Sequence, residues 1–269
     1  MLKKRIIFTL LYDSGQFMLS RNFRLQRVGD IKWLQKNYNF SQIAYFIDEL
    51  IVLDISRQPR QSELFCDALK QVASGCFVPV AAGGGVRSIE LARALLRSGA
   101  DKVVVNSALF DDSDLLGKLA QEFGQQCLVA SVDVKVDEFN QPWCWTQNGQ
   151  IRQAHPLAQW LSSLLKLPVG ELYLNSIDRD GTGQGYDMAL LDCLPSPMPI
   201  PVILAGGVGN ALHMAQGLRD DRVDAVATAH LFNFLGDGLS KARAQLQAQG
   251  FSMASWLSPS AIRQGAQLV

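Results

Sequence analysis

The chain has 269 residues, 48% of them hydrophobic, and its 25 basic residues balance 25 acidic ones. A balanced charge, without a basic run interleaved with aromatic residues, argues against nucleic acid as a partner. No apolar stretch approaches the roughly 18 residues of a membrane span. The apolar run from Ile6 ends at Asp13 without a signal-peptide cleavage site, so we expect a cytoplasmic protein that does not enter a membrane.

Short apolar runs alternate with longer segments of helical periodicity, the pattern of successive β-strand and α-helix units. We expect eight parallel strands, each followed by a helix, in a closed (β/α)8 TIM barrel over residues 1–250. The polar segment 137–150 contains the turn dipeptide Asn148-Gly149 and is predicted to be a β-ribbon after the fifth strand. Residues 251–269 form a weakly patterned tail, either a short helix or partly disordered. The predicted strands are Arg5–Tyr12, Glu49–Ile55, Phe77–Ala82, Lys102–Asn106, Cys127–Lys135, Glu171–Asn175, Val202–Ala205 and Ala225–Thr228.

An internal repeat relates the two halves of the chain. Residues 77–110 recur in outline at 199–232, and each copy contains a strand, a glycine cluster, an amphipathic helix and a second strand. We interpret the chain as two fused half-barrels. The shift is 122 positions, and it relates Gly84 to Gly206, Glu49 to Glu171 and Leu11 to Asp133.

The loops that follow the strands build the active site in a barrel of this kind. Glycine clusters there expose backbone N–H groups, which favours phosphate binding; the alternative is that they only permit tight turns with positive φ. Two clusters related by the repeat favour the phosphate interpretation, and a ligand with a phosphate at each end. The segments concerned are Gly83-Gly84-Gly85, Asn106-Ser107, Asp178 to Thr182 and Gly206-Gly207.

Metal chemistry is not indicated. The five cysteines are scattered without a CxxC motif, and His155, His213 and His230 lack ligand spacing with one another. An odd number of scattered cysteines is typical of reduced thiols. We therefore expect no metal and no cofactor.

The order and spacing of six segments resemble HisF, the cyclase subunit of imidazole glycerol phosphate synthase, over residues 1 to about 234. In that family a partner glutaminase releases ammonia, which travels through the barrel to a bisphosphate substrate. The resemblance assigns phosphate contacts to Gly84, Gly85, Asn106 and Ser107 at one end, and to Asp180, Gly181, Gly206, Gly207, Ala229 and His230 at the other. At His230 the family usually has a small hydroxyl residue. The segments are RIIFTLL, DELIVLDI, PVAAGGGVRSIELARALLRSGADKVVVNS, FGQQCLVASVDVK, SIDRDGTGQGYD and PVILAGGVGN.

The family's cyclisation uses two aspartates that face each other across the mouth, where ring closure needs a proton acceptor and a proton donor. The resemblance assigns one of them to Asp133, whereas the other position holds Leu11. A leucine cannot transfer a proton, so we expect the cyclase activity to be lost or reduced. Asp13 could replace the missing group only if it faces the cavity, and we expect it to begin the following loop instead.

At the strand starts, the resemblance implies a ring of charges, Arg5, Glu49, Lys102 and Glu171, that closes the barrel floor and gates ammonia entry. The alternative is that this ring is only a structural plug. Asp101 matches a family residue that contacts the glutaminase. Two further carboxylates match positions at the mouth, where each either contacts a substrate hydroxyl or orders its own loop: Asp54 and Asp178.

Three functions fit these observations. The leading hypothesis is a HisF-like paralogue associated with amidation of surface-polysaccharide sugars, since such proteins tend to have an apolar residue at the position of Leu11. It would take ammonia from a HisH-like glutaminase and deliver it to a phosphorylated or sugar acceptor, with a sugar amidotransferase as a further partner. The alternatives are an authentic cyclase of histidine biosynthesis, which is a lyase, and a silent ammonia-conducting scaffold.

Overall fold

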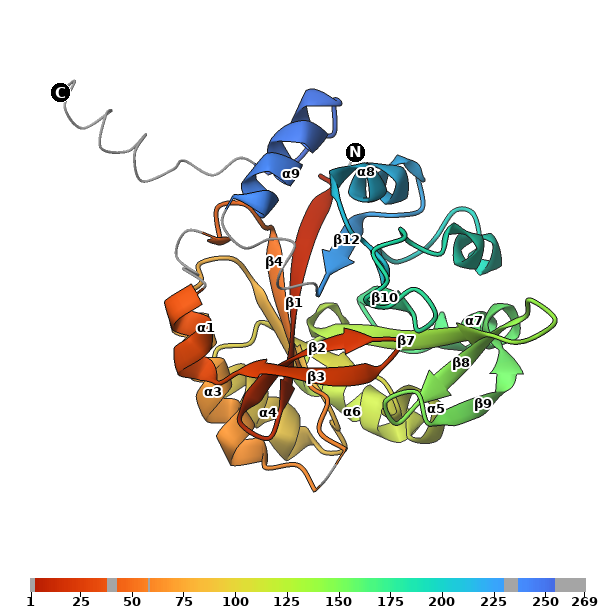
Figure 1. Ribbon diagram of the computed structural model, residues 1–269. Coiled ribbons are helices and arrows are strands. Elements are labelled where there is room, and N and C mark those ends of the chain that lie inside the picture. Colours follow the sequence, from red (N-terminus) through yellow and green to blue (C-terminus); the bar gives the residue numbers. More distant parts are fainter. Residues whose placement is uncertain (1–2, 38–42, 58, 230–236, 255–269) are drawn as a thin grey trace.

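The computed structural model describes residues 3–37, 43–57, 59–229 and 237–254 (Figure 1). In this part of the chain eight parallel strands close into a barrel in the order β1, β4, β5, β6, β7, β10, β11, β12 and back to β1. The predicted (β/α)8 barrel is confirmed. The eight strands are β1 (Arg5–Asp13), β4 (Glu49–Asp54), β5 (Val80–Gly83), β6 (Lys102–Val105), β7 (Leu128–Val136), β10 (Glu171–Ser176), β11 (Val202–Ala205) and β12 (Ala225–Thr228).

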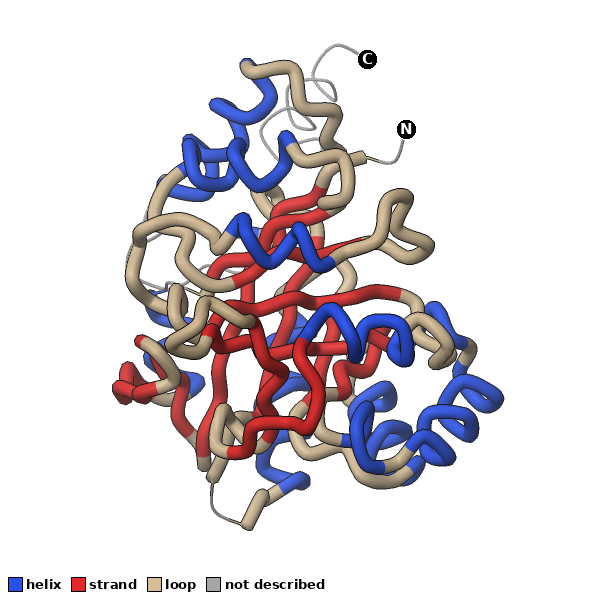
Figure 2. Tube along the Cα trace, turned by 90° about the vertical axis from the view of Figure 1, so that its right-hand side faces the viewer, coloured by secondary structure: helices blue, strands red, loops and turns tan. Residues whose placement is uncertain are grey.

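Helices surround the barrel (Figure 2) and bury one face against the strands. A second, smaller apolar cluster fills the interior of the barrel, where side chains of alternate strand residues meet. The helices are α1 (Ile31–Asn37), α3 (Ser62–Ser74), α4 (Ile89–Arg97), α5 (Ala108–Asp111), α6 (Ser113–Phe123), α7 (Leu157–Leu164), α8 (Ala211–Arg219) and α9 (Gly238–Ala248), with 3-10 turns η1 (Gln125–Cys127) and η2 (Met188–Cys193).

The expectation of a helix after every strand is wrong for the sixth strand of the barrel. Between β10 and β11, all of which is described, the chain forms only the 3-10 turn η2. Gly181, Gly183 and Gly185 each have positive φ there, and prolines follow η2. These residues favour turns over a regular helix.

The segment after β1, which the sequence indicated as a loop, forms an antiparallel hairpin of β2 (Gln16–Arg21) and β3 (Arg24–Gly29). The hairpin continues the sheet, because Leu11 pairs with Met18 and Asp13 with Gln16. Phe17 is the one buried residue of these two strands, so the segment lacks the apolar pattern that identified the barrel strands.

The ribbon after β7 is present and is longer than predicted. It consists of β8 (Pro142–Thr146) and β9 (Ile151–Pro156), so it extends to residue 156 instead of ending at 150. Its turn lies at Asn148-Gly149 as expected, with φ of 57° and 72°. The side chains of β9 are mostly exposed, which explains why its apolar pattern was too weak to show the end of the ribbon.

The repeat shift changes by one residue at the last strand. Ala82 on β5 pairs with Val103, 21 positions further on, whereas Leu204 on β11 pairs with Val226, 22 positions further on. The shift is therefore 123 at β12, and it relates Asn106 to Ala229.

The first residues of the predicted tail pack against the start of β1, which lies beside α8 and α9 in Figure 1. Lys4 N donates to Ser252 O at 2.8 Å, and Met253 is buried. The buried pair of Arg243 on α9 and Asp48 supports this end of the barrel. The rest of the tail, 255–269, lies outside the described residues. No helix of the described part is long and apolar enough to cross a membrane.

Candidate functional site

A cavity of about 370 Å³ lies at the carboxyl ends of the barrel strands, covered by residues of the β2–β3 hairpin and of the β8–β9 turn. Most of the residues expected at the mouth line it. Asp178 does not, and His230 lies outside the described residues. The expected residues that line the cavity are Leu11, Asp54, Gly84, Gly85, Asn106, Ser107, Asp133, Asp180, Gly181, Gly206, Gly207 and Ala229.

Asp133 projects from β7 and is held by two amides. Asn106 Nδ2 donates to its Oδ2 at 3.0 Å, and Asn175 Nδ2 donates to its Oδ1 at 2.9 Å. Burial raises the pKa of Asp133 to about 6, with a smaller contribution from the negative charge of Asp180, and the two amides only partly offset this increase. A carboxyl group with such a pKa can both release and accept a proton near neutral pH.

Leu11 lies on the opposite side of the cavity, because β1 and β7 are four strands apart in either direction around the barrel. Its neighbours in the sheet are Leu53 on β4 and Met18 on β2. At the equivalent position of the other half-barrel, Asp133 pairs with Asn175. The β7 side of the mouth is thus polar, and the β1 side is aliphatic.

Two other carboxylates line the described part of the cavity, and both accept hydrogen bonds from neighbouring loop or hairpin residues. Asp54 Oδ1 accepts hydrogen bonds from Ser56 N at 3.0 Å and from Ser56 Oγ at 2.5 Å. Asp180 Oδ2 accepts from Ser20 Oγ at 2.5 Å and from Phe23 N at 3.1 Å, both in the hairpin. Each therefore orders a loop.

Neither Asp13 nor Asp178 lines the cavity. Asp13 is the last residue of β1, and its carboxylate accepts a hydrogen bond from Ser14 Oγ. Asp178 Oδ2 accepts from Val136 N at 2.8 Å. The contact of Asp178 fits the loop-ordering alternative. Among the described residues, no other carboxylate lies opposite Asp133 at the position that Leu11 occupies.

The glycines at the mouth allow close approaches of the backbone. A Cβ atom on Gly84, where φ is 117°, would lie 2.1 Å from Asp54 O, and one on Gly207, where φ is 103°, would lie 2.2 Å from Gly185 O. Each cluster precedes a capped helix: Ser88 accepts from Leu91 N, and Asn210 accepts from His213 N. Both clusters therefore offer backbone N–H groups near a helix N-terminus.

Several residues of the cavity were not found from the sequence. Tyr173 lies inside the barrel, where its hydroxyl is 3.4 Å from Thr9 Oγ1, and burial raises its pKa. The alternation Glu171, Tyr173, Asn175 could have placed it on the inner face of β10. Three arginines that follow β4 and β5 also line the cavity: Arg57, Arg60 and Arg87.

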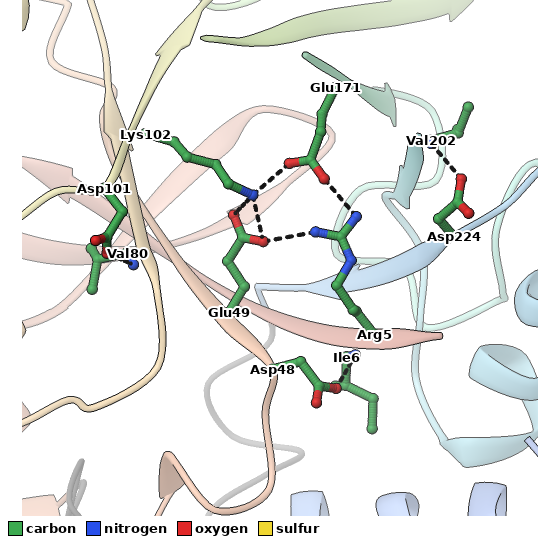
Figure 3. A network of polar contacts seen from close by, with 10 residues as sticks. All are labelled: Arg5, Ile6, Asp48, Glu49, Val80, Asp101, Lys102, Glu171, Val202 and Asp224. Atoms are coloured by element: carbon green, nitrogen blue, oxygen red, sulfur yellow. Dashed lines mark hydrogen bonds and ion pairs between the residues drawn. The ribbon is translucent and has the colours of Figure 1, made fainter. Parts of the chain in front are cut away.

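At the opposite end of the barrel, the four predicted charges form a closed ring (Figure 3). Arg5 contacts Glu49 at 3.0 Å and Glu171 at 2.6 Å, and Lys102 contacts the same two carboxylates at 3.0 and 2.7 Å. Burial raises the pKa of Glu49. For Glu171 the effect of burial is outweighed by Arg5 and Lys102, which lower its pKa. The ring is electrically neutral and fills the barrel floor.

Asp101 has a structural partner beside this ring. Its Oδ2 accepts from Val80 N at 2.8 Å, and Asp48 and Asp224 accept in the same way from Ile6 N and Val202 N (Figure 3). Asp101 thus belongs to a set of aspartates that bind strand starts, and its contact with a partner stays a prediction. No group of three or more potential metal ligands occurs among the described residues.

Comparison with known proteins agrees with this architecture. Residues 25–236 match the family model described as "Histidine biosynthesis protein". The chain is also 48% identical, over 257 residues that cover 95% of each chain, to the "Putative imidazole glycerol phosphate synthase subunit hisF2" of Parasynechococcus marenigrum (strain WH8102). Together with the barrel, this match shows that the chain belongs to the histidine biosynthesis protein family and is a HisF-like member of it.

Proposed function

We propose that this chain is the ammonia-accepting subunit of a glutamine amidotransferase whose cyclase activity has been lost or strongly reduced. A HisH-like glutaminase docks at the barrel floor near Asp101, and ammonia enters through the charged ring. It passes along the barrel interior to a phosphorylated or sugar acceptor in the cavity, with a sugar amidotransferase as a further partner. The relative's name, a subunit of imidazole glycerol phosphate synthase, supports the subunit role. The pair is proposed to act in the cytoplasm.

One observation carries the loss of cyclase activity: Leu11 faces the cavity opposite Asp133, between Leu53 and Met18. Ring closure needs proton transfer at opposed points, and an aliphatic side chain supplies none. The other lining carboxylates, Asp54 and Asp180, are engaged with their own loops. The closed ring at the floor supports the retained role in ammonia transfer.

The test is reconstitution of the chain with its cognate glutaminase, followed by assay of imidazole glycerol phosphate formation from the family's bisphosphate substrate. We expect no measurable turnover with glutamine or with an ammonium salt. Leu11→Asp should raise the rate at least about 100-fold, because a placed acid–base group contributes that much or more. Leu53→Asp is the matched control: it introduces the same charge one strand away and should leave the rate unchanged. Robust turnover by the unaltered chain would reject the proposal.

A second candidate is an authentic cyclase, a lyase of histidine biosynthesis, that works with Asp133 and a displaced base. In its favour, two amides hold Asp133 at the cavity, and burial raises its pKa into a range that suits proton transfer near neutral pH. In that case the unaltered chain turns over, Asp133→Asn abolishes the activity, and Leu11→Asp has little effect. A scaffold without its own acceptor would instead stimulate glutamine hydrolysis while the cavity stays empty.

A further inference from the structure

The cations that line the cavity all lie on one side of it. In the described part of the lining they are Arg57 and Arg60 after β4 and Arg87 after β5. The opposite side, formed by the residues that follow β10 and β11, contributes the carboxylate of Asp180 and no described lysine or arginine. Asp54 also lines the first side, but three arginines outnumber it, so the mouth of the barrel is electrically polarised.

Each of these guanidinium groups has donors available for a ligand. Arg60 Nε lies 3.7 Å from Asp54 Oδ2, and Arg57 Nη2 donates to Phe23 O at 2.6 Å. Arg87 contacts the exposed Asp111 through Nη1. A guanidinium carries five N–H donors, so one contact to a described residue leaves most of them for the oxygens of an anion.

Arg60 lies directly against one of the glycine clusters. A Cβ atom on Gly85 would lie 2.8 Å from Arg60 Nη1, so the absence of a side chain at Gly85 is what admits the guanidinium. A phosphate bound at this turn would accept hydrogen bonds both from backbone N–H groups and from the Arg60 guanidinium. Such charge-assisted contacts are the strongest hydrogen bonds that a protein offers an anion.

The other side of the cavity is covered by protein and carries the opposite charge. A Cβ atom on Gly181 would lie 2.1 Å from Ser20 O, which shows how closely the hairpin covers this turn. The Asp180 carboxylate accepts hydrogen bonds from the hairpin at the same place. An anion bound on this side would face a carboxylate.

We propose that the cavity binds an acceptor with a single anionic end, a sugar that carries one phosphate or diphosphate group. The anionic group lies at Gly84 and Gly85 among Arg57, Arg60 and Arg87, and the uncharged end points toward Asp180. This inference rests on the proposed function, since it takes the cavity to be the site of the ammonia acceptor. It replaces the ligand with a phosphate at each end that the two glycine clusters indicated.

The test follows backbone amide resonances of the full chain labelled with ¹⁵N-glycine during titration with inorganic phosphate and with pyrophosphate. We expect Gly84 and Gly85 to shift while Gly206 and Gly207 do not. Tighter binding of pyrophosphate identifies a diphosphate group, and equal binding a monophosphate. Arg60→Gln, and separately Arg57→Gln, should weaken binding about tenfold. Arg179→Gln is the matched control, because Arg179 packs on Gly207 without lining the cavity.

The inference is overturned if both glycine pairs shift over the same concentration range, if Gly84 and Gly85 do not respond, or if only the Arg179 variant weakens binding. Robust cyclase turnover, which requires a bisphosphate substrate, would contradict both the proposed function and this inference. Shifts confined to Gly84 and Gly85 in a chain that takes no ammonia from a glutaminase would contradict the proposed function alone. Shifts at both pairs in an inactive chain would contradict this inference alone.

Discussion

Replacing Asp133 with asparagine should stabilise the protein, and the gain should depend on pH. The pKa of this carboxyl group rises from 3.8 to about 6 because the folded chain buries it. That difference corresponds to about 3 kcal/mol of preference for the protonated form. Since the cavity keeps part of the side chain in contact with solvent, about 3 kcal/mol is an upper value for the gain.

The surroundings of Asp133 can accept an amide. Asn106 Nδ2 donates both to Asp133 Oδ2 and to Ser131 O, so its orientation is fixed. Asn175 makes its one described side-chain donation to Asp133, so its amide can rotate and present its oxygen. The substituted side chain could then accept from Asn106 and donate to Asn175, and the variant need not leave a buried polar atom without a partner.

The sign of the pH dependence follows from proton binding. Below about pH 3 the carboxyl group is largely protonated in both the folded and the unfolded chain, and its burial costs almost no stability. As pH rises through 4 to 6 the unfolded chain loses its proton first, so the folded state loses stability relative to it. The advantage of Asp133→Asn should therefore be small near pH 4 and fully developed above about pH 7. Urea unfolding of both proteins at these two values measures it. An equal difference at pH 4 and pH 8, or destabilisation at pH 8, would falsify the reasoning.

Two further variants test the ring and the hairpin. Lys102→Met should destabilise the chain by about 2–3 kcal/mol at pH 7, because Glu49 and Glu171 then share Arg5 alone. The loss should be smaller at acidic pH, because burial raises the pKa of Glu49 and a protonated Glu49 needs no counter-charge. Urea unfolding at neutral and at acidic pH measures both values, and a loss that does not vary with pH would contradict this. Gly181→Ala should release the hairpin of residues 16–29, because the added Cβ would lie 2.1 Å from Ser20 O, and limited proteolysis should cut there faster. Gly183→Ala is its control, since φ at Gly183 is also positive and its nearest atom would be 3.9 Å away. Equal cleavage of the two variants would argue against the hairpin contact.

The barrel was predictable from the sequence because its strands are buried on both faces and therefore appear as continuous apolar runs. Burial of this kind covers the whole of β11 and β12 and most of β4. The β2–β3 hairpin and the end of the ribbon lie on the surface, where polar residues form strands by pairing with a neighbour. Strands of this kind lack a regular pattern of apolar residues, so the sequence does not predict them.

Most of the site was predictable for a different reason. Glycines after buried strands and polar residues at strand ends converge at one end of any parallel barrel, so Gly84 and Asn106 could be assigned to it together, whereas Asp133 was assigned through the resemblance to HisF. The arginines could not, because nothing in the sequence of the loop after β4 shows that Arg57 and Arg60 turn back over the cavity. The electrical polarity of the mouth is a property of the folded loops.

The geometry of the floor bears on whether the ring is a plug or a gate. Arg5 and Lys102 each contact both Glu49 and Glu171. When one cation withdraws, neither carboxylate is left buried without a counter-charge, so partial opening costs less than leaving an isolated buried charge. Lys102 is the easier one to withdraw, since an ammonium group on a flexible stem moves as a point charge, whereas the planar fork of Arg5 is fixed by two carboxylates. The ring therefore has contacts that are compatible with a gate, and its role in ammonia entry stays a prediction.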